Sequence, residues 1–250
     1  MSDNDLPPSA IPPSATISQP FEPPASTLEA FRNHPWSNSL LSNPDYFPIR
    51  TWSRTAKSTG EDTFFAKTLG TDSTIPHVLT LRRKDIPAVP RDPPPLGLDA
   101  QGRPITPKAP ARPPDMIALL MLSNPGISGH PSTAHGGAVA TVLDEVVSLC
   151  VALHVPAYSE NEAEARGALY TIQLDVRYKR PVYVPGLAVV KAWCVARDGK
   201  KYWMRGQLVQ EEEEETGKNG RSGAGQLEWA KRKTVRTEAL GFWLQTKGKL

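Results

Sequence analysis

The chain of 250 residues is long enough to bury one substantial core or two small ones, but its 26 prolines mean that part of it cannot be packed secondary structure. Its 29 basic and 26 acidic residues leave a net charge of only +3, which is too weak and too scattered for a nucleic-acid surface. No apolar run is long enough to cross a bilayer. We therefore expect a globular protein with neither a nucleic-acid partner nor a membrane span.

The prolines gather in two segments. Seven fall within the first 24 residues and ten lie between Pro87 and Pro114. This composition is typical of segments that do not build a packed core. We predict a disordered leader over residues 1–25 and a single domain over residues 26–250. That domain contains a proline-rich loop over residues 86–114 and an acidic, glycine-rich loop over residues 210–226.

The first half of the domain shows short elements. Ser26 and Glu29 have capping-box spacing, which predicts a helix that ends near Pro35, and a second helix or turn covers residues 37–41. Two strands are predicted over residues 63–70 and 74–84, joined as a hairpin by a polar turn. The apolar run of residues 115–122 is short for a helix and is stopped by Asn-Pro-Gly, so it predicts a buried strand.

The second half predicts one long helix followed by strands. The helix covers residues 137–153 and is apolar on nearly every face. Alternating patterns then predict strands over residues 168–182, 186–210 with a hairpin turn at Asp198-Gly199, and 237–245. The fold class is therefore α+β, with a curved antiparallel sheet wrapped around one central helix. Such a unit leaves one side of its sheet and part of its helix open for dimerisation.

The two cysteines and the N-terminal residues bear on the compartment. Cys150 and Cys194 both lie in apolar runs, which favours buried free thiols and a reducing environment. The first 20 residues contain two acids, no arginine and no apolar core, unlike a secretory signal or a transit peptide. We expect a cytoplasmic protein, with mitochondria as the alternative.

The start of the long helix has the features of a chemical site. The first amides of a helix lack intrahelical acceptors, so those at Gly136 and Gly137 are suited to bind an oxygen that becomes negative. Asp144 lies two turns further on, about 10 Å along the axis, in a polar stripe with Thr141, Glu145 and Ser148. The alternative interpretation is that the stripe is the wet side of an amphipathic helix and that His135 is an ordinary N-terminal histidine.

These residues resemble a known family. His-Gly-Gly followed by an acid nine positions after the histidine, together with the strand "YTIQLDVRYKRP", resembles hotdog-fold acyl-CoA thioesterases of the branch with PaaI and the mammalian thioesterase-superfamily members. The resemblance implies a hotdog fold, with Asp144 as general base or nucleophile towards the thioester. It implies that the amide of Gly137, with or without that of Gly136, polarises the carbonyl while His135 orients the carbonyl or the turn. It also implies that Thr171 reaches the site from a neighbouring subunit and helps to position the water.

The resemblance also implies a substrate and an assembly. Arg177, Lys179, Lys200 and Lys201 match positions that contact coenzyme A, although ordinary exposed charges explain them equally well. The assembly is expected to be a homodimer or a dimer of dimers. No cofactor is expected, and no metal, because the histidines show no ligand spacing with one another or with the cysteines. One departure is Gly129, which stands beside His130 where some relatives have asparagine.

The predicted function is therefore hydrolysis of an acyl-CoA to free acid and coenzyme A. Thioester hydrolysis needs an activated water or nucleophile and charge stabilisation at the carbonyl oxygen. The main alternative is a non-catalytic hotdog module that binds acyl-CoA or a protein. A hotdog hydratase is a further alternative, and it requires a different arrangement of histidine and acid.

Overall fold

A computed structural model describes residues 17, 19–95, 100–102, 105, 110–156, 158, 167–212 and 232–246. Its main feature is a seven-stranded sheet in which every neighbouring pair is antiparallel. The order of the strands across the sheet is β1-β2-β3-β7-β8-β9-β6. Their bounds are Tyr46–Ile49 (β1), His77–Arg83 (β2), Met116–Leu122 (β3), Leu169–Tyr178 (β6), Gly186–Asp198 (β7), Lys201–Glu211 (β8) and Lys233–Gln245 (β9).

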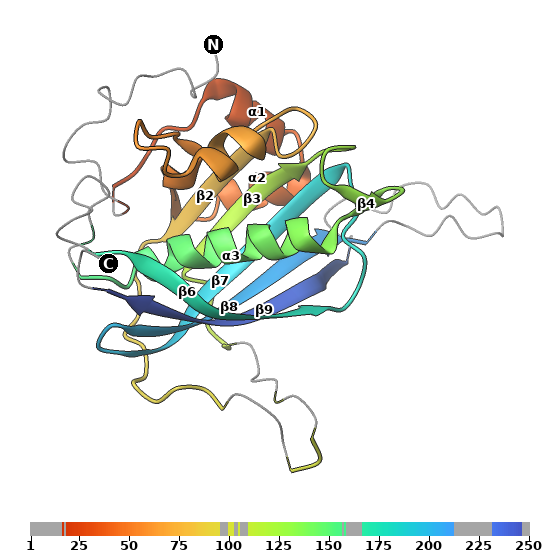
Figure 1. Ribbon diagram of the computed structural model, residues 1–250. Helices are drawn as coiled ribbons and strands as arrows, with labels where there is room; N and C mark the ends of the chain where they lie inside the picture. Colours follow the sequence, from red (N-terminus) through yellow and green to blue (C-terminus); the bar gives the residue numbers. More distant parts are fainter. Residues whose placement is uncertain are drawn as a thin grey trace.

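The long helix α3, Gly136–Ala152, lies across one face of this sheet and contacts β6, β7, β8 and β9 (Figure 1). Its apolar side chains form the centre of the larger core, with Leu143 and Cys150 fully buried. On β8, a Cβ atom added to Gly206 would lie 2.8 Å from Cγ2 of Val147, so glycine permits the close approach of helix and sheet. The predicted α+β architecture, a sheet around one central helix, is confirmed.

The opposite face of the sheet is covered at one end. Helices α1, Ala25–Arg32, and α2, Pro35–Leu41, pack there and enclose a second, smaller core. Phe31 of α1 is fully buried in it against residues of β1, β2, β3 and β7. The sequence had suggested that only one side of the sheet is covered. In the structure, the N-terminal helices also cover the second side at the β1 end.

The helix α1 begins two residues earlier than its capping pattern indicated. Pro24 is its N-cap residue and makes no side-chain cap hydrogen bond, so Ser26 lies inside the first turn. The capping box predicted from Ser26 and Glu29 is therefore wrong, although the helix itself is confirmed. Further back, the Phe21 amide donates to the Pro48 carbonyl at 2.9 Å, so the described end of the predicted leader packs against β1.

The hairpin predicted over residues 63–84 is wrong in its first strand. Residues Phe64–Thr68 form a single π-helical turn, η4, and β2 pairs with β1 and β3 instead. Phe65, Ala66 and Leu69 are buried while Phe64 is 57% exposed, which is helical spacing rather than alternation. The strand β1 was missed because it is short and contains Pro48, a residue that is tolerated at the edge of a sheet.

The remaining elements agree with the sequence to within a few residues. β3, β6 and the β7–β8 hairpin lie where predicted, with Gly199 at a positive φ of 57° in the turn, and β9 begins four residues earlier than expected. A small sheet of β4, Ser128–His130, and β5, Thr133–Ala134, precedes α3 and was not predicted. Within the described residues, the predicted proline-rich loop contains neither helix nor strand, and the acidic loop lies outside them beyond residue 212.

The two edges of the large sheet differ. β1 has four residues, whereas β6 has ten and carries three exposed apolar or aromatic side chains, Tyr170, Ile172 and Tyr178. A long edge strand with exposed apolar groups is a surface on which another strand can pair.

Among the described helices, none combines the length and the apolar character that a membrane span requires.

Candidate active site

The centre of the candidate site is the carboxylate of Asp144 on α3. Thr171 of β6 donates from Oγ1 to Oδ1 of Asp144 at 2.9 Å. Burial raises the pKa of the Asp144 carboxyl above its ordinary value, and the Thr171 hydrogen bond partly offsets this rise. Thr171 reaches Asp144 within one chain, so a neighbouring subunit is not needed to bring these two residues together, in contrast to the expectation from the resemblance. A carboxylate in this setting is a competent proton acceptor.

The start of α3 is capped by His135. Its Nδ1 accepts a hydrogen bond from the Gly137 amide at 3.0 Å, which makes it the N-cap residue of the helix. In a single chain without substrate, the Gly137 amide is therefore already bonded to the histidine ring. Tyr178 of β6 donates its hydroxyl to the Gly136 carbonyl at 2.8 Å and ties the helix start to the sheet edge. His135 and Gly137 are exposed, so a ligand can approach the helix start.

The predicted donor and the predicted base are not adjacent in one chain. Seven residues of helix separate Gly137 from Asp144, which corresponds to about 10 Å along the axis. In a productive complex the carbonyl oxygen lies about 3 Å from the amide, and the attacking water lies about 3 Å from both the carbonyl carbon and the carboxylate. Along the axis of one helix, the Gly137 amide and Asp144 are further apart than such an arrangement favours.

The glycine that replaces the asparagine of some relatives has a structural reason. A Cβ atom at Gly129 would lie 2.9 Å from Cα of His135, so a larger residue does not fit without movement of the helix start. The neighbouring His130 is exposed on β4.

The four basic residues matched to coenzyme A contacts lie at two ends of the sheet. Lys179 forms an ion pair with Glu238 at 2.7 Å, and Arg177 donates to the Ile105 carbonyl at 3.0 Å. Lys200 and Lys201 are exposed at the β7–β8 turn. Arg177 is opposite Glu238 of β9, whereas Lys201 is opposite Leu244, six residues and roughly 20 Å further along. A single chain does not gather the four charges into one patch.

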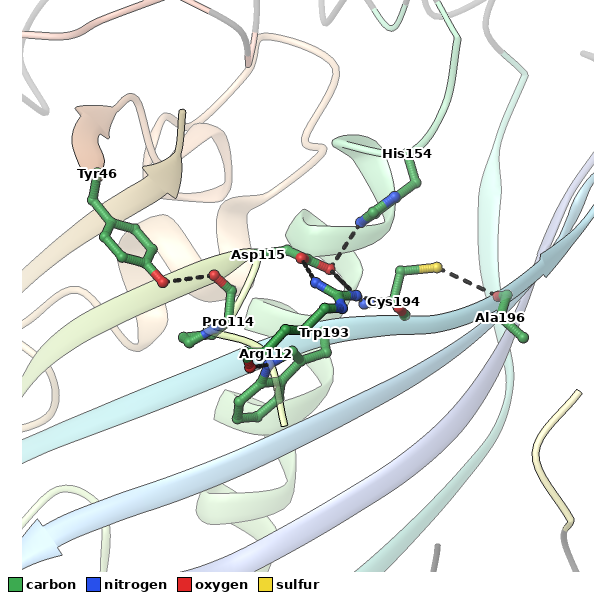
Figure 2. Close-up of polar contacts among 8 residues, drawn as sticks. All are labelled: Tyr46, Arg112, Pro114, Asp115, His154, Trp193, Cys194 and Ala196. Carbon is green, nitrogen blue, oxygen red and sulfur yellow. Dashed lines mark hydrogen bonds and ion pairs between the residues drawn. The ribbon is translucent and has the colours of Figure 1, made fainter. Parts of the chain in front are cut away.

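A second polar cluster, which the sequence analysis missed, is buried at the other end of α3 (Figure 2). Asp115, fully buried just before β3, pairs with the Arg112 guanidinium and accepts from His154 Nε2 at 3.2 Å and from the Cys194 amide at 2.9 Å. Arg112 also donates to the Cys194 carbonyl at 2.7 Å. These bonds connect the end of the proline-rich loop, the end of α3 and β7.

The same cluster contains potential metal ligands. Asp115, Cys150 and His154 place ligand atoms within 4.8 Å of one another. The statement that the histidines have no ligand spacing with the cysteines is therefore wrong for Cys150 and His154, which are four residues apart. A cation would have to displace the Arg112 guanidinium from Asp115, so the donor set favours a structural ion pair. Both cysteines are free and buried, and burial raises the pKa of each thiol.

The pKa of Glu145, the neighbour of Asp144, is shifted more strongly than that of Asp144. Burial raises the pKa of the Glu145 carboxyl to about 7, while the Ser53 hydroxyl beside it acts in the opposite direction. The sequence showed Glu145 only as a member of a polar stripe. Its neighbours come from residues 52–62, a segment far away in the sequence, so no local pattern could have revealed them.

Comparisons with known proteins agree with the sequence resemblance. Residues 132–216 match the family model described as Thioesterase superfamily, a region that contains His135, Asp144 and Thr171. The acyl-coenzyme A thioesterase THEM4 of Rattus norvegicus is 29% identical over 88 residues. That match covers 35% of this chain and 33% of the relative, so the chain spans about a third of the length of the curated relative. The predicted resemblance to thioesterases is confirmed.

The solved structures to which the chain is similar include the following two. A hypothetical thioesterase of Streptococcus pneumoniae, solved with coenzyme A, is 16% identical with a TM-score of 0.35, over 54% of this chain and 83% of that one. The PaaI protein of Escherichia coli, from the phenylacetic acid degradation operon, is 8% identical with a TM-score of 0.37, over 54% of this chain and 74% of that one.

Proposed function

We propose that this chain, whose residues 132–216 match the thioesterase superfamily, hydrolyses acyl-CoA thioesters to a free acid and coenzyme A. The observation that supports this most directly is the partly buried carboxylate of Asp144 on α3, which Thr171 of β6 holds by a hydrogen bond. The chain is also similar to an acyl-CoA thioesterase over 88 residues, and the proposed reaction requires no metal or cofactor.

The proposed chemistry uses Asp144 as the general base. Asp144 accepts a proton from a water whose oxygen bonds to the acyl carbon, and the carbonyl oxygen becomes an oxyanion. The Gly137 amide at a helix start donates a hydrogen bond to this oxyanion. To do so, it gives up its hydrogen bond to His135 Nδ1. The C–S bond then breaks, and the thiolate of coenzyme A takes up the proton. A direct attack by Asp144 through an anhydride is the mechanistic variant.

We further propose that the complete site needs two chains. The separation of about 10 Å along the axis between Gly137 and Asp144 of one helix favours an oxyanion donor from another copy. Antiparallel pairing of the β6 edges of two copies would place the two α3 helices side by side in opposite directions. The helix start of one copy would then lie towards Asp144 of the other. The assembly is therefore a homodimer or a dimer of dimers.

The same pairing bears on the coenzyme A contacts. Arg177 and Lys179 lie at the end of β6, whereas Lys200 and Lys201 lie at the level of its beginning. Antiparallel pairing places the end of one β6 beside the beginning of the other, so basic residues of both kinds come to the same end of the joined sheet. We propose that they bind the phosphates of coenzyme A there. Cytoplasmic location stays a prediction.

The first test is a panel of acyl-CoA thioesters, short to long and aromatic, with thiol release as the measurement. We expect release above the uncatalysed rate for at least one chain type. A folded dimer that binds an acyl-CoA thioether analogue but releases no thiol from any member would contradict hydrolysis. That result would favour the non-catalytic binding module.

The dimer gives a second prediction. Ile172 is 55% exposed on β6, and a lysine there places two like charges at the pairing edge. Ile172→Lys is expected to raise the dimer dissociation constant at least tenfold and to lower activity at dilute concentrations. Sedimentation velocity checks the first and thiol release the second. Phe64→Lys, a change at an equally exposed residue on η4, is the control; equal effects of both changes would contradict pairing through β6.

The pH dependence of turnover gives a third prediction. The Thr171 hydrogen bond stabilises the charged form of Asp144 and lowers its pKa, so removing the hydroxyl raises the pKa. Activity that needs the carboxylate is lost below this pKa, and Thr171→Ala is expected to move the acidic limb of kcat/KM to higher pH. Thr234→Ala, which removes a threonine bond to Glu212, is the matched control. If the acidic limb lies at the same pH in wild type, Thr171→Ala and Thr234→Ala, the limb does not report the titration of Asp144.

A further inference from the structure

A cavity of about 330 Å³ lies between the second half of α3 and the N-terminal segment 52–62, which includes the short helix η3, Trp52–Arg54. We name it the 52–62 cavity. From α3 its wall contains residues 145, 148, 149 and 152, which share one face of the helix. Leu169 and Tyr170 of β6 form another part of the wall.

The 52–62 cavity begins next to the candidate active site. Ser148 in its wall lies one helical turn after Asp144, on the same side of α3. Tyr170 immediately precedes Thr171, which holds Asp144. An acyl group whose carbonyl carbon lies at Asp144 can therefore extend along α3 towards this space. Its volume is within the range of small-molecule pockets, at the lower end.

The wall of the 52–62 cavity is polar where it meets the helix. Glu145 faces the Ser53 hydroxyl, and burial raises the pKa of Glu145 to about 7, so a large fraction of this carboxyl is protonated at neutral pH. Ser148 accepts a hydrogen bond from Trp243 Nε1 at 2.8 Å and keeps its own hydroxyl proton for another partner.

The outer wall is built from a charged trio. Lys57 forms ion pairs with Glu61 at 3.1 Å and with Asp62 at 2.8 Å. The hydrogen bonds that Lys57 donates to these two acids, together with their negative charges, outweigh the effect of burial, so the pKa of Lys57 is raised and its charge is retained. Lys57 compensates one of the two carboxylates, so the trio keeps a net charge of −1. On the α3 side of the 52–62 cavity, Glu145 is the ionisable group of the wall.

We propose that the 52–62 cavity binds the acyl group of the substrate and that Glu145 selects acyl groups bearing a hydroxyl over plain hydrocarbon chains of the same length. A hydrocarbon chain would displace water from the carboxyl of Glu145 and from the hydroxyl proton of Ser148 and would offer neither group a new hydrogen bond. A substrate hydroxyl both donates and accepts, so it satisfies either protonation state of Glu145. Sites that bond a substrate hydroxyl reject the analogue without it. This inference rests on the proposed function.

The test compares binding with turnover in the full-length chain. The probes are two non-hydrolysable thioethers of coenzyme A, one with a hexyl group and one with a 6-hydroxyhexyl group, measured by calorimetry. Thiol release from hexanoyl-CoA and 6-hydroxyhexanoyl-CoA is measured in parallel. For the wild type we expect about tenfold tighter binding of the hydroxylated thioether and a similar ratio of kcat/KM.

The variants separate selectivity from folding. Glu145→Leu is expected to bring both ratios close to one, whereas Glu145→Gln, which keeps hydrogen-bonding groups, is expected to preserve much of the preference. Glu29→Leu, at an exposed glutamate of α1, controls for the loss of a charge. Equal binding of the two thioethers by wild type, or an unchanged preference in Glu145→Leu, overturns this inference even where hydrolysis is observed. Selective thioether binding without thiol release would instead overturn the proposed hydrolysis alone.

Discussion

Asp144→Asn is expected to lower kcat for acyl-CoA hydrolysis by about a thousandfold while the chain stays folded and continues to bind a thioether analogue of the substrate. An amide at this position keeps the shape of the side chain and can still bond with Thr171. It cannot take the proton of the attacking water, and a positioned general base contributes about 10²–10⁴-fold. Thiol release under saturating substrate measures the loss.

The control for this change is Asp72→Asn, at an exposed carboxylate outside the site. It is expected to leave kcat unchanged. Wild-type turnover in Asp144→Asn would remove Asp144 from the mechanism. A loss of turnover together with loss of thioether binding would indicate a binding role rather than a base.

Asp115→Ala is expected to lower the free energy of unfolding by about 3–5 kcal/mol. Asp115 is fully buried and accepts from the Arg112 guanidinium, His154 and the Cys194 amide (Figure 2). Removing the carboxylate leaves a cationic guanidinium and two other donors without their acceptor, which costs more than the lost contacts. Denaturant unfolding followed by tryptophan fluorescence measures the difference.

The effect of Asp115 is expected to depend on pH. Burial alone raises the pKa of this carboxyl, but hydrogen bonds from His154, Arg112 and the Cys194 amide outweigh burial and hold the pKa below its ordinary value. A folded-state pKa below the unfolded value gives stability that is present above about pH 4 and is lost as the pH falls through the folded-state pKa. The difference between wild type and Asp115→Ala should therefore shrink in acid.

Asp92→Ala, at an exposed aspartate of the proline-rich loop, is the matched control and is expected to change stability by less than about 0.5 kcal/mol. A similarly small change in Asp115→Ala at neutral pH would contradict the structural role of the buried cluster.

Much of the architecture could be predicted because its signals are local. The spacing of apolar residues in α3 and the alternation in β6, β7 and β8 depend on neighbours a few residues apart, and these elements lie where predicted. The prediction of a strand at residues 63–70 was wrong because a short apolar run does not distinguish a strand from a single helical turn. The strand β1 was not predicted because Pro48 interrupts its pattern.

The candidate site shows the same division. The His-Gly-Gly motif and the acid nine residues later are a local pattern on one helix, so the sequence alone pointed to His135 and Asp144. The role of Thr171 came from a resemblance, which implied that it reaches the site from a neighbouring subunit, whereas the structure shows its hydroxyl bonded to Asp144 of the same chain. The Asp115 cluster and the 52–62 cavity had no local signal, since each gathers residues from segments more than 30 positions apart.

The sequence by itself determined the central helix, the strands around it and the motif at the helix start, because backbone periodicity and short spacings specify these features. Only the tertiary structure decided which face α1 and α2 cover, which groups surround Glu145, and how Arg112, Asp115 and His154 meet. Those features depend on the packing of distant segments. Burial also sets the pKa values of Asp144 and Glu145, and burial is a property of the packed fold rather than of either residue.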